Sequence, residues 1–375
     1  MKAKNIEVKF IYDPAHRLDA VLKAYSFDDE EIISQHDVYL YGNKYFFKLR
    51  ANNGIPTKLL KYKRLTSPVL RESAFESVLL EGDAERSVAK YIFDNVIRAG
   101  VVTKQRRQYR SREFLLNVDA ILDDDSSTKL YSAVEIEYFV RDANSKAAQQ
   151  TVDNILRVFG VKPYQIIPYS NIHMVNMLNA SRAYRQAYNS TKRRGRLVLI
   201  DGGSGTGKST VKEILVSAEG FHYAKRDTTR APRPDDFTSA DYNFVSHDEF
   251  ARKALSGKYI EFRDFLFGMS YGLPWEEFAE PLCQGKKVMA LINLGNGFFT
   301  KKLFPEATLV LLHADLHTIR ARLNRRGDMT EEQIEERLEN NRVAADYAEA
   351  YDANIDTSKF GPRQVAEQIV RSISA

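Results

Sequence analysis

Charged and apolar residues alternate with a period of two at several places in the first half of the chain. Residues 6–10 read Ile-Glu-Val-Lys-Phe, and the same alternation recurs around Leu49, Tyr62 and Ile136 and along residues 104–110. The charged positions of these segments are Glu7, Lys9, Lys48, Arg50, Lys61, Lys63, Lys104, Arg106, Arg110, Glu135 and Glu137. Because successive side chains of a strand point to opposite faces, the pattern predicts several strands with one charged face each. In an ordinary antiparallel sheet those faces would lie in water.

The second half opens with a different pattern. An apolar run at residues 197–200 predicts a buried strand, and residues 210–215 predict a helix. Between them the chain fits the phosphate-binding pattern G-x-x-x-x-G-K-[ST]. The predicted ATP-binding residues are Gly202, Gly203, Ser204, Gly205, Thr206, Gly207, Lys208, Ser209 and Thr210.

The chemistry of a triphosphate explains each residue type in this loop. Glycines let backbone N–H groups turn toward the β-phosphate, and the helix N-terminus adds positive potential. Lys208 is expected to reach the β and γ oxygens, and Ser209 is expected to ligate Mg²⁺. The sequence therefore predicts that the chain binds ATP with Mg²⁺.

Length and composition predict two domains. The chain has 375 residues, 43% hydrophobic and 28% charged, which is ordinary for a globular protein. Residues 181–196 hold six basic residues and no acidic one, and we interpret the middle of this stretch as a solvated connector, with a nucleic-acid arm as the alternative. The predicted limits are residues 1–182 for the first domain, 183–195 for the linker and 196–375 for the second domain.

The cysteine count, the N-terminal sequence and the net charge restrict where the protein is expected and what it is expected to bind. A single cysteine, Cys283, excludes an internal disulfide and a thiolate metal cluster. The N-terminus lacks the apolar core of a signal peptide, and no run approaches a membrane span, so we expect a cytoplasmic protein with no membrane partner. The net charge of +5 is too small to imply nucleic acid by itself. Oligomeric state is left open.

Beyond the phosphate loop, the chain resembles the guanylate kinase family from about Arg196 to Ala375. The resemblance is carried by the T-T-R-x-P-R block at residues 228–233 and by short segments around Tyr242, Glu261 and Tyr271. It implies that arginines and tyrosines clamp the phosphate of an acceptor, with planar guanidinium groups and hydroxyl donors on one anion. The implied acceptor-binding residues are Arg226, Arg230, Arg233, Tyr242, Glu261 and Tyr271.

The resemblance extends to the lid helices of the family. Residues 320–327 and 330–338 match them, and three arginines of these helices would surround the transferring phosphoryl group. The implied catalytic residues are Lys208, Arg230, Arg322, Arg326 and Arg337. The alternative is ordinary charge pairing along the helix with Glu332, Glu335 and Glu336.

Base recognition departs from the family pattern. Where the family reads guanine with a Ser, a Ser or Thr and acids, this chain has Arg226, Leu273, Leu291 and Asn293, and only Glu261 is kept. A site that hydrogen-bonds a base rejects analogues strongly, so these changes argue against GMP. A nucleotide, a phosphorylated sugar and a nucleic-acid end stay open as acceptors.

The first half resembles the CYTH superfamily, especially its class IV adenylate cyclase and thiamine triphosphatase branch. The carrying segments are residues 6–10, 63–64 with 71–73, 118–119 and 134–137. The resemblance implies an antiparallel β-barrel whose tunnel holds a triphosphate with Mg²⁺ or Mn²⁺. It assigns phosphate contacts to Lys9, Lys48, Arg50, Lys63, Arg106 and Arg110, and metal contacts to Glu7, Glu135, Glu137 and Asp119. Asn5 replaces the first acid of the family motif.

We therefore predict an α+β CYTH-like antiparallel barrel followed by an α/β P-loop domain with a mostly parallel sheet. The predicted function is ATP- and Mg²⁺-dependent phosphoryl transfer to a phosphorylated acceptor, joined to a barrel that binds a triphosphate and hydrolyses it, cyclises it or only senses it. The alternatives are a nucleic-acid end-processing enzyme and a nucleotide-sensing binding protein.

Overall fold

The computed structural model of the chain describes all residues except 1, 14–15, 43–44, 67–70, 80–81, 83–86, 88–96, 124–127, 140–144, 233–240, 265–268, 293–294, 328 and 374–375. Side chains are also not described at positions 2–5, 42, 45–46, 56, 61–66, 71–79, 97–98, 145–148, 264, 343 and 345. The described residues form two compact units, one up to Asn176 and one from Met177 onward.

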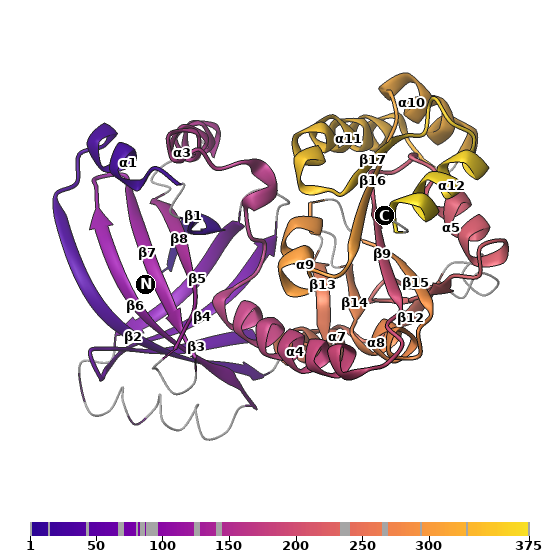
Figure 1. Cartoon of the computed structure of the whole chain (residues 1–375). Helices are drawn as coiled ribbons and strands as arrows, with labels where there is room; N and C mark the ends of the chain where they lie inside the picture. Colours follow the sequence, from indigo (N-terminus) through magenta and orange to yellow (C-terminus); the bar gives the residue numbers. More distant parts are fainter. Residues whose placement is uncertain are drawn as a thin grey trace. The chain divides into compact units, whose positions relative to one another are not determined.

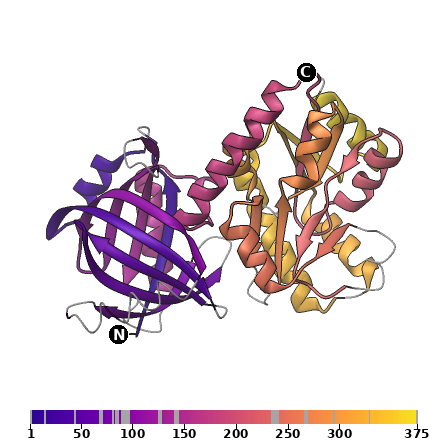
Figure 2. The same ribbon diagram turned by 90° about the horizontal axis from the view of Figure 1, so that it is seen from below.

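The N-terminal unit is a closed antiparallel barrel of eight strands (Figure 1). The strands are β1 (Lys2–Ile11), β2 (Asp29–Gly42), β3 (Tyr45–Asn52), β4 (Ile55–Thr66), β5 (Arg71–Leu79), β6 (Ile97–Arg110), β7 (Phe114–Leu122) and β8 (Lys129–Phe139). Their order around the barrel is β1-β5-β4-β3-β2-β6-β7-β8. Figure 2 shows the strands crossing as one continuous wall. The predicted barrel is confirmed.

Strand register brings the charged positions of the sequence together. Glu7 of β1 lies opposite Glu137 of β8, and Lys9 lies opposite Glu135. On the neighbouring strands, Arg106 of β6 lies opposite Asp119 of β7, and Asp37 of β2 lies opposite Arg50 of β3. Because side chains alternate along each strand, these charged residues share one face of the wall.

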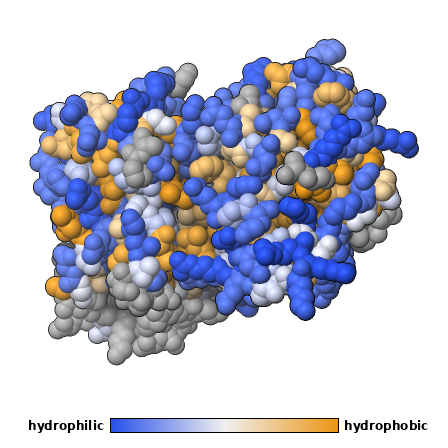
Figure 3. Space-filling view, in the orientation of Figure 1, coloured by the Kyte–Doolittle hydropathy of each residue, from blue (hydrophilic) through white to orange (hydrophobic). Residues whose placement is uncertain are grey.

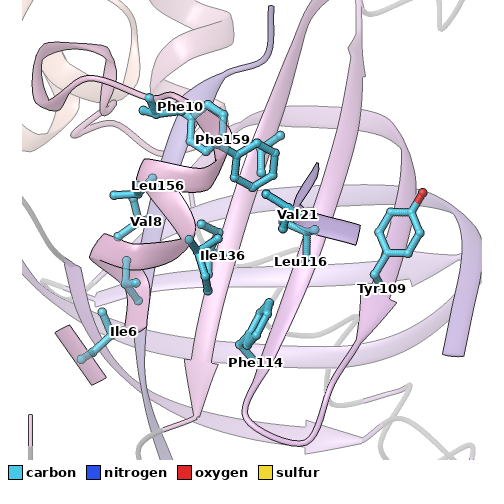
Figure 4. Packing of buried hydrophobic residues seen from close by; sticks show 14 residues of the cluster. Ile6, Val8, Phe10, Val21, Tyr109, Phe114, Leu116, Ile136, Leu156 and Phe159 are labelled. Carbon is cyan, nitrogen blue, oxygen red and sulfur yellow. The ribbon is translucent and has the colours of Figure 1, made fainter. Parts of the chain in front are cut away.

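The apolar face of β1, β6, β7 and β8 is covered by two helices, α1 (Leu18–Ala24) and α3 (Ser145–Phe159). Phe10 packs edge-on against Phe159 of α3, with ring centroids 5.2 Å apart (Figure 4). Val8, Leu116 and Ile136 lie in the same buried cluster. This hydrophobic cluster therefore lies outside the barrel, between its wall and the helices, and the charged side chains lie on the inner face.

The C-terminal unit is built on a parallel five-stranded sheet with the order β10-β15-β9-β16-β17. These strands are β9 (Arg196–Asp201), β10 (His222–Tyr223), β15 (Lys287–Leu291), β16 (Thr308–His313) and β17 (Ala353–Asp356). Helices α5 (Lys208–Ser217) and α12 (Pro362–Ser372) cover it, with Val211, Leu215, Val365 and Ile369 in the buried cluster. This sheet agrees with the predicted parallel P-loop fold.

A second sheet of four strands carries the acceptor segments, and the sequence did not predict it. Its order is β12-β11-β14-β13, with strands β11 (Arg226–Thr228), β12 (Tyr242–Phe244), β13 (Tyr259–Asp264) and β14 (Ser270–Pro274). Helices α7 (His247–Leu255), α8 (Glu276–Cys283) and α9 (Gly297–Leu303) belong to the same unit. Helices α10 (Leu316–Arg326) and α11 (Glu331–Arg342) pack through Ile319, Leu323, Ile334 and Leu338 and are followed by η2 (Val343–Ala350).

The basic stretch that we interpreted as a solvated linker is helical over most of its length. After the short η1 (Pro163–Gln165), helix α4 runs over Asn171–Ser190, and its second half packs within the C-terminal unit. Arg185 pairs with Glu306 at 2.8 Å, and Tyr184 stacks on Trp275 with ring centroids 4.9 Å apart. The structure divides at Asn176, before the predicted limit at 182, because these side chains have partners in the second unit.

The surface agrees with the ordinary composition. On the face shown in Figure 3, hydrophilic residues are spread over both units with smaller hydrophobic areas between them. Among the helices that the structure describes, none combines the length and the apolar character that crossing a membrane requires.

Candidate functional site

The loop between β9 and α5 wraps around the side chain of Lys208. The Lys208 Nζ donates to the carbonyl oxygen of Gly203 at 2.8 Å and to that of Gly202. Thr206 Oγ1 also donates to the carbonyl of Gly203, at 2.8 Å, which closes the loop on itself. Burial lowers the pKa of Lys208 to about 8. The ammonium therefore stays mostly charged at neutral pH and lies at the start of a helix, where an anion is favoured.

Two glycines of this loop lie very close to their neighbours, Gly202 to backbone and Gly203 to a side chain. A Cβ at Gly202 would lie 2.4 Å from the carbonyl oxygen of Leu312, and φ there is +147°. A Cβ at Gly203 would lie 2.0 Å from Oδ1 of Asn341. Asn341 itself donates to the carbonyl of Ser204 at 3.2 Å, so helix α11 closes directly over the loop.

An acid that was not predicted as a site residue lies at the start of the loop. Asp201 ends β9, is fully buried, and accepts hydrogen bonds from the Gly202 N–H at 2.6 Å and from the Tyr351 hydroxyl. Burial raises the pKa of Asp201 to about 6, despite these hydrogen bonds and the nearby Lys208. Asp201 thus ties the loop to the residues that follow η2.

The three arginines of the predicted lid have different surroundings. Arg322 of α10 donates to the Gly205 carbonyl at 3.1 Å and to Thr357 at 2.8 and 2.9 Å, so it holds the loop in place. Arg326 is exposed at the end of α10, close enough for its charge to help lower the pKa of Lys208 after burial. Arg337 of α11 has a buried Nε with no hydrogen-bond partner among the described residues. Of the acids considered in the alternative, Glu335 pairs with Arg320, which also binds Glu331, but this pairing joins α10 to α11 and does not run along one helix.

Three of the predicted acceptor residues gather on the second sheet. The rings of Tyr242 and Tyr271 meet edge-on at 5.9 Å between centroids. The guanidinium of Arg230 lies over Tyr242, 5.3 Å from the ring centroid. One guanidinium and two phenol hydroxyls are thereby brought together, which suits a phosphate. Arg233 lies outside the described residues.

A buried ion pair lies at the positions where the resemblance implies recognition of the base. Arg226 Nη2 donates to Glu261 Oε1 at 2.7 Å, and Asn296 Nδ2 donates to Oε2 at 2.6 Å. Glu261 and Leu273 are fully buried and face each other in the register of β13 and β14. Leu291 ends β15, and Asn293 lies outside the described residues. Both oxygens of the one retained acid are therefore engaged by side chains of the chain itself.

The barrel interior holds two clusters of ion pairs. In the first, Arg106 makes a bidentate pair with Asp119, with both N–O distances 2.7 Å, and approaches Glu135 at 3.3 Å and Glu137 at 3.6 Å. Lys9 lies 3.4 Å from Glu135. Burial raises the pKa of Glu135, but Lys9 and Arg106 outweigh it and hold that pKa well below its usual range. Glu135 stays ionised inside the protein because bases surround it, whereas burial and the neighbouring Glu135 raise the pKa of Glu137.

The second cluster centres on Asp37. Arg50 binds it in bidentate fashion at 2.7 and 2.8 Å, and Lys48 lies 3.6 Å from it. Burial, reinforced by the neighbouring Arg50, lowers the pKa of Lys48 to about 7. Across both clusters the ion pairs join five bases with five acids, which are Lys9, Lys48, Arg50, Lys104, Arg106, Glu7, Asp37, Asp119, Glu135 and Glu137.

The structure thus brings most of the predicted barrel ligands together. Arg110 is exposed at the end of β6, and the side chains of Asn5 and Lys63 lie outside the described residues. Within the described part of the chain, no group of three or more His, Cys, Asp or Glu side chains is arranged to hold a metal ion. Asp119 is held by Arg106 and Lys104 instead. The phosphate and metal roles of these residues stay predictions.

Known proteins match the C-terminal unit by sequence. Residues 194–370 match the family model for guanylate kinase. The chain is 34% identical to guanylate kinase of Bacillus anthracis over 170 residues, which is 44% of this chain and 82% of that protein. The chain belongs to the guanylate kinase family. It is also 32% identical to guanylate kinase of Bacillus subtilis (strain 168), over 43% of this chain and 80% of that one.

Solved structures resemble each unit. The guanylate kinase of Anaplasma phagocytophilum is 23% identical over 49% of this chain and 86% of its own, with a TM-score of 0.39. On the other half, HpAC1 from Hippeastrum, with a dominant triphosphatase activity, is 14% identical over 46% of this chain and 94% of its own, with a TM-score of 0.33. The PH1012 protein of Pyrococcus horikoshii OT3 is 18% identical over 44% and 96%, with a TM-score of 0.35.

Four residues around the site of the guanylate kinase domain were not predicted from the sequence: Asp201, Asn296, Asn341 and Thr357. Asn341 follows Arg337 by four positions on α11, so helical spacing alone would have placed the two on one face. Asp201 ends an apolar strand just before the loop, which is also a visible signal. Asn296 and Thr357 reach the site through tertiary contacts, which no local sequence pattern predicts.

Proposed function

We propose that the C-terminal unit transfers the γ-phosphoryl group of ATP to a phosphate oxygen of a phosphorylated acceptor, either a nucleotide or another small molecule. The observation that carries the proposal is the seating of Lys208 in the glycine loop, with Arg322 fastened to the same loop. Membership of the guanylate kinase family supports this reaction class. Guanylate kinases and P-loop kinases in general work with Mg²⁺ and a nucleoside triphosphate.

The residues present fit a triphosphate. The buried Nε of Arg337 has no hydrogen-bond partner in the described part of the chain, although an arginine N–H seldom stays unpaired inside a protein. A phosphoryl oxygen would satisfy it. Gly202 leaves room only for backbone, as a phosphate-wrapping loop needs. Ser209 on the first turn of α5 would hold Mg²⁺, which neutralises charge on the phosphates when bound.

Positioning and charge neutralisation are the whole contribution of the chain to this reaction. Lys208 holds the donor phosphates, Arg326 and Arg337 neutralise the transferring group, and Arg230 with Tyr242 and Tyr271 holds the acceptor phosphate in line with it. An acceptor phosphate oxygen is already anionic, so no side chain has to remove a proton. Arg322 keeps the loop in shape from the side.

For the barrel we propose binding of a triphosphate together with a divalent cation, Mg²⁺ or Mn²⁺. Five bases inside a closed barrel, all buried or largely buried, are the observation that favours it. Among the side chains that the structure describes, five acids already balance these bases, so an anion alone would leave the acids uncompensated, whereas an anion with a cation on Glu7, Glu135 or Glu137 would not. Hydrolysis or cyclisation of the triphosphate is a further step that these contacts do not require.

One experiment tests the kinase proposal. The full chain is incubated with ATP, with Mg²⁺ or Mn²⁺, and with a panel of nucleotides, sugar phosphates and 5′-ended oligonucleotides, and products are identified by mass. We expect ADP and a product heavier by one phosphoryl group with at least one small acceptor. Transfer to oligonucleotide ends alone would favour the nucleic-acid end-processing alternative.

A second experiment isolates the barrel. Tripolyphosphate is titrated into the full-length Lys208→Ala variant with and without Mg²⁺, so that the weakened glycine loop contributes little. We expect binding that needs the divalent cation and is lost on Arg106→Gln. Binding that is equally tight without the cation would contradict the metal part of the proposal, and no binding at all would remove the barrel site.

A further inference from the structure

The retained acid among the implied acceptor residues already accepts a hydrogen bond on each of its two oxygens. Glu261 is fully buried, and its two oxygens accept hydrogen bonds from Arg226 at 2.7 Å and Asn296 at 2.6 Å. Arg226 is 6% exposed, so this is a buried ion pair and not a passing surface contact. Breaking it to admit a ligand would leave a charge buried without its partner.

Guanine presents N–H donors at N1 and at its 2-amino group. A carboxylate reads that edge by accepting both donors, so its two oxygens have to be available. Here each oxygen already accepts a hydrogen bond, from the Arg226 guanidinium or from the Asn296 amide, and Arg226 neutralises the carboxylate charge, so a guanine edge has to compete with donors of the chain itself. Leu273, opposite Glu261 in the sheet, adds an apolar wall where a hydroxyl would have offered another hydrogen bond.

Arg226 also lies beside the phosphate-binding cluster. Its guanidinium is 5.6 Å from the ring centroid of Tyr271, which in turn meets Tyr242. Burial is the main cause of the lowered pKa of Lys208, and the charge of Arg226 contributes to it, so Arg226 lies within electrostatic reach of the donor loop. A molecule held by its phosphate on Tyr242 and Tyr271 would therefore extend toward Arg226.

We propose that Arg226 is a specificity-determining residue, which removes Glu261 from base recognition and selects an acceptor with anionic oxygens at the end away from its reacting phosphate. The substrate class is a phosphorylated molecule that carries a second phosphate or a carboxylate. This inference rests on the proposed phosphotransferase function and narrows its acceptor. Arg226 acts here through direct contact with the acceptor and through its hold on Glu261.

The test is a binding comparison by titration calorimetry, without ATP. We expect Arg226→Ser to bind GMP at least about tenfold more tightly than the unaltered chain, since the change frees Glu261 for the guanine edge. AMP, which lacks both donors, should gain nothing. In the double variant Arg226→Ser with Glu261→Gln the gain for GMP should disappear, because the released carboxylate is the group that produces it.

A second arm probes the anionic end. Glucose 1,6-bisphosphate and 6-phosphogluconate are compared with glucose 6-phosphate, which separates a second phosphate from a carboxylate. The unaltered chain should prefer at least one of the first two by about tenfold, and Arg226→Ser should lose that preference. No preference in the unaltered chain, or GMP binding that is as tight there as in Arg226→Ser, would overturn the inference.

Controls keep the two proposals separate. Melting curves of each variant show whether it folds, and Arg226→Gln, which keeps a donor for Glu261, replaces Arg226→Ser if that variant does not fold and should show a smaller gain for GMP. If the unaltered chain transfers phosphate to no acceptor, the proposed function fails while the binding comparison still decides the role of Arg226.

Discussion

The barrel interior and the glycine loop are both suited to anions, but they hold their positive charge in different ways. In the barrel, each base lies within 4 Å of an acid, as Arg106 does with Asp119 and Arg50 with Asp37. In the loop, Lys208 rests on backbone carbonyl oxygens, and the positive potential comes from backbone N–H groups at the start of α5. One site is balanced by side chains, and the other by the backbone.

Because the two sites hold their charge differently, substitutions in the barrel should affect stability and substitutions in the loop should affect function. Removing a base from the barrel leaves a buried carboxylate without compensation, so the fold itself is weakened. Removing Lys208 leaves behind only carbonyl groups that a water molecule can satisfy, so binding and catalysis suffer and the fold does not. Substitutions in the two regions should therefore give opposite profiles of stability and activity.

The largest expected effect is on stability, from Arg106→Ala. Asp119 loses its bidentate partner and Glu135 loses one of its bases in a buried site, and we expect the free energy of unfolding of the N-terminal unit to fall by about 3–5 kcal/mol. Denaturant unfolding followed by circular dichroism measures it. The matched control is the next residue: Arg107→Ala removes a pair whose members are about half exposed, and should cost less than about 1 kcal/mol. Equal losses from both variants would contradict the comparison.

Lys208→Ala should reduce activity and leave stability almost unchanged. We expect phosphoryl transfer to fall at least about 10²–10³-fold, because the ammonium contacts charge that develops on the phosphates, with little change in melting temperature. Initial rates and thermal melting check the two halves of the prediction. Lys287→Ala, on β15 and over the ring of Phe221, serves as a control that should keep full activity. A Lys208→Ala chain that turns over normally would remove the assigned mechanism.

Asp201 adds a pH dependence to the loop. Burial raises its pKa from 3.8 to about 6, so the folded state binds a proton more tightly than the unfolded state does. Stability from this group is present below about pH 4 and is lost as the pH rises to about 6, by about 3 kcal/mol. Asp201→Asn should become more stable relative to the unaltered chain by that amount between pH 4 and pH 7. Parallel stability curves for the two proteins would show that Asp201 does not titrate in this range.

The smallest expected effect is on anion affinity in the barrel. The pKa of Lys48 is about 7, lowered from 10.5 by burial and by Arg50, so its positive charge is lost as the pH rises through neutrality. Between pH 6 and pH 8 the affinity of the unaltered chain for tripolyphosphate should fall by about tenfold more than the affinity of the Lys48→Gln variant does. The reason is that the unaltered chain loses one charged hydrogen bond over this range. Comparing the two proteins at each pH cancels the titration of the ligand. An unchanged ratio would show that Lys48 does not contact the anion.

Local periodicity was enough to predict strands with one charged face, whereas the closed barrel was predicted from the resemblance to the CYTH superfamily. Residues 6–10 and 134–137 alternate so regularly that their strands and their charged face were predictable, and the phosphate loop was predictable from its spacing alone. The partners of the acids in the barrel were not predictable from the sequence, because Asp119 contacts Arg106 only through the register of two strands. The pair between Arg226 and Glu261 depends in the same way on the second sheet, whose strands of three to six residues are too short to show a period. The helix through the basic stretch near Arg185 was missed because its charged residues find partners far away in sequence.

The closure of the barrel has a consequence for how the protein is made. Glu7 of the first strand lies opposite Glu137 of the last, so the pairing of β1 with β8 is the contact that completes the circle. During synthesis β1 can pair with β5 early, but its second edge stays open until the ribosome has released β8 and then α3, which covers the apolar outer face. For that interval the nascent chain exposes both a strand edge and a row of bases. A chaperone that shields apolar strand edges should therefore have its greatest effect on this chain before residue 160 has emerged.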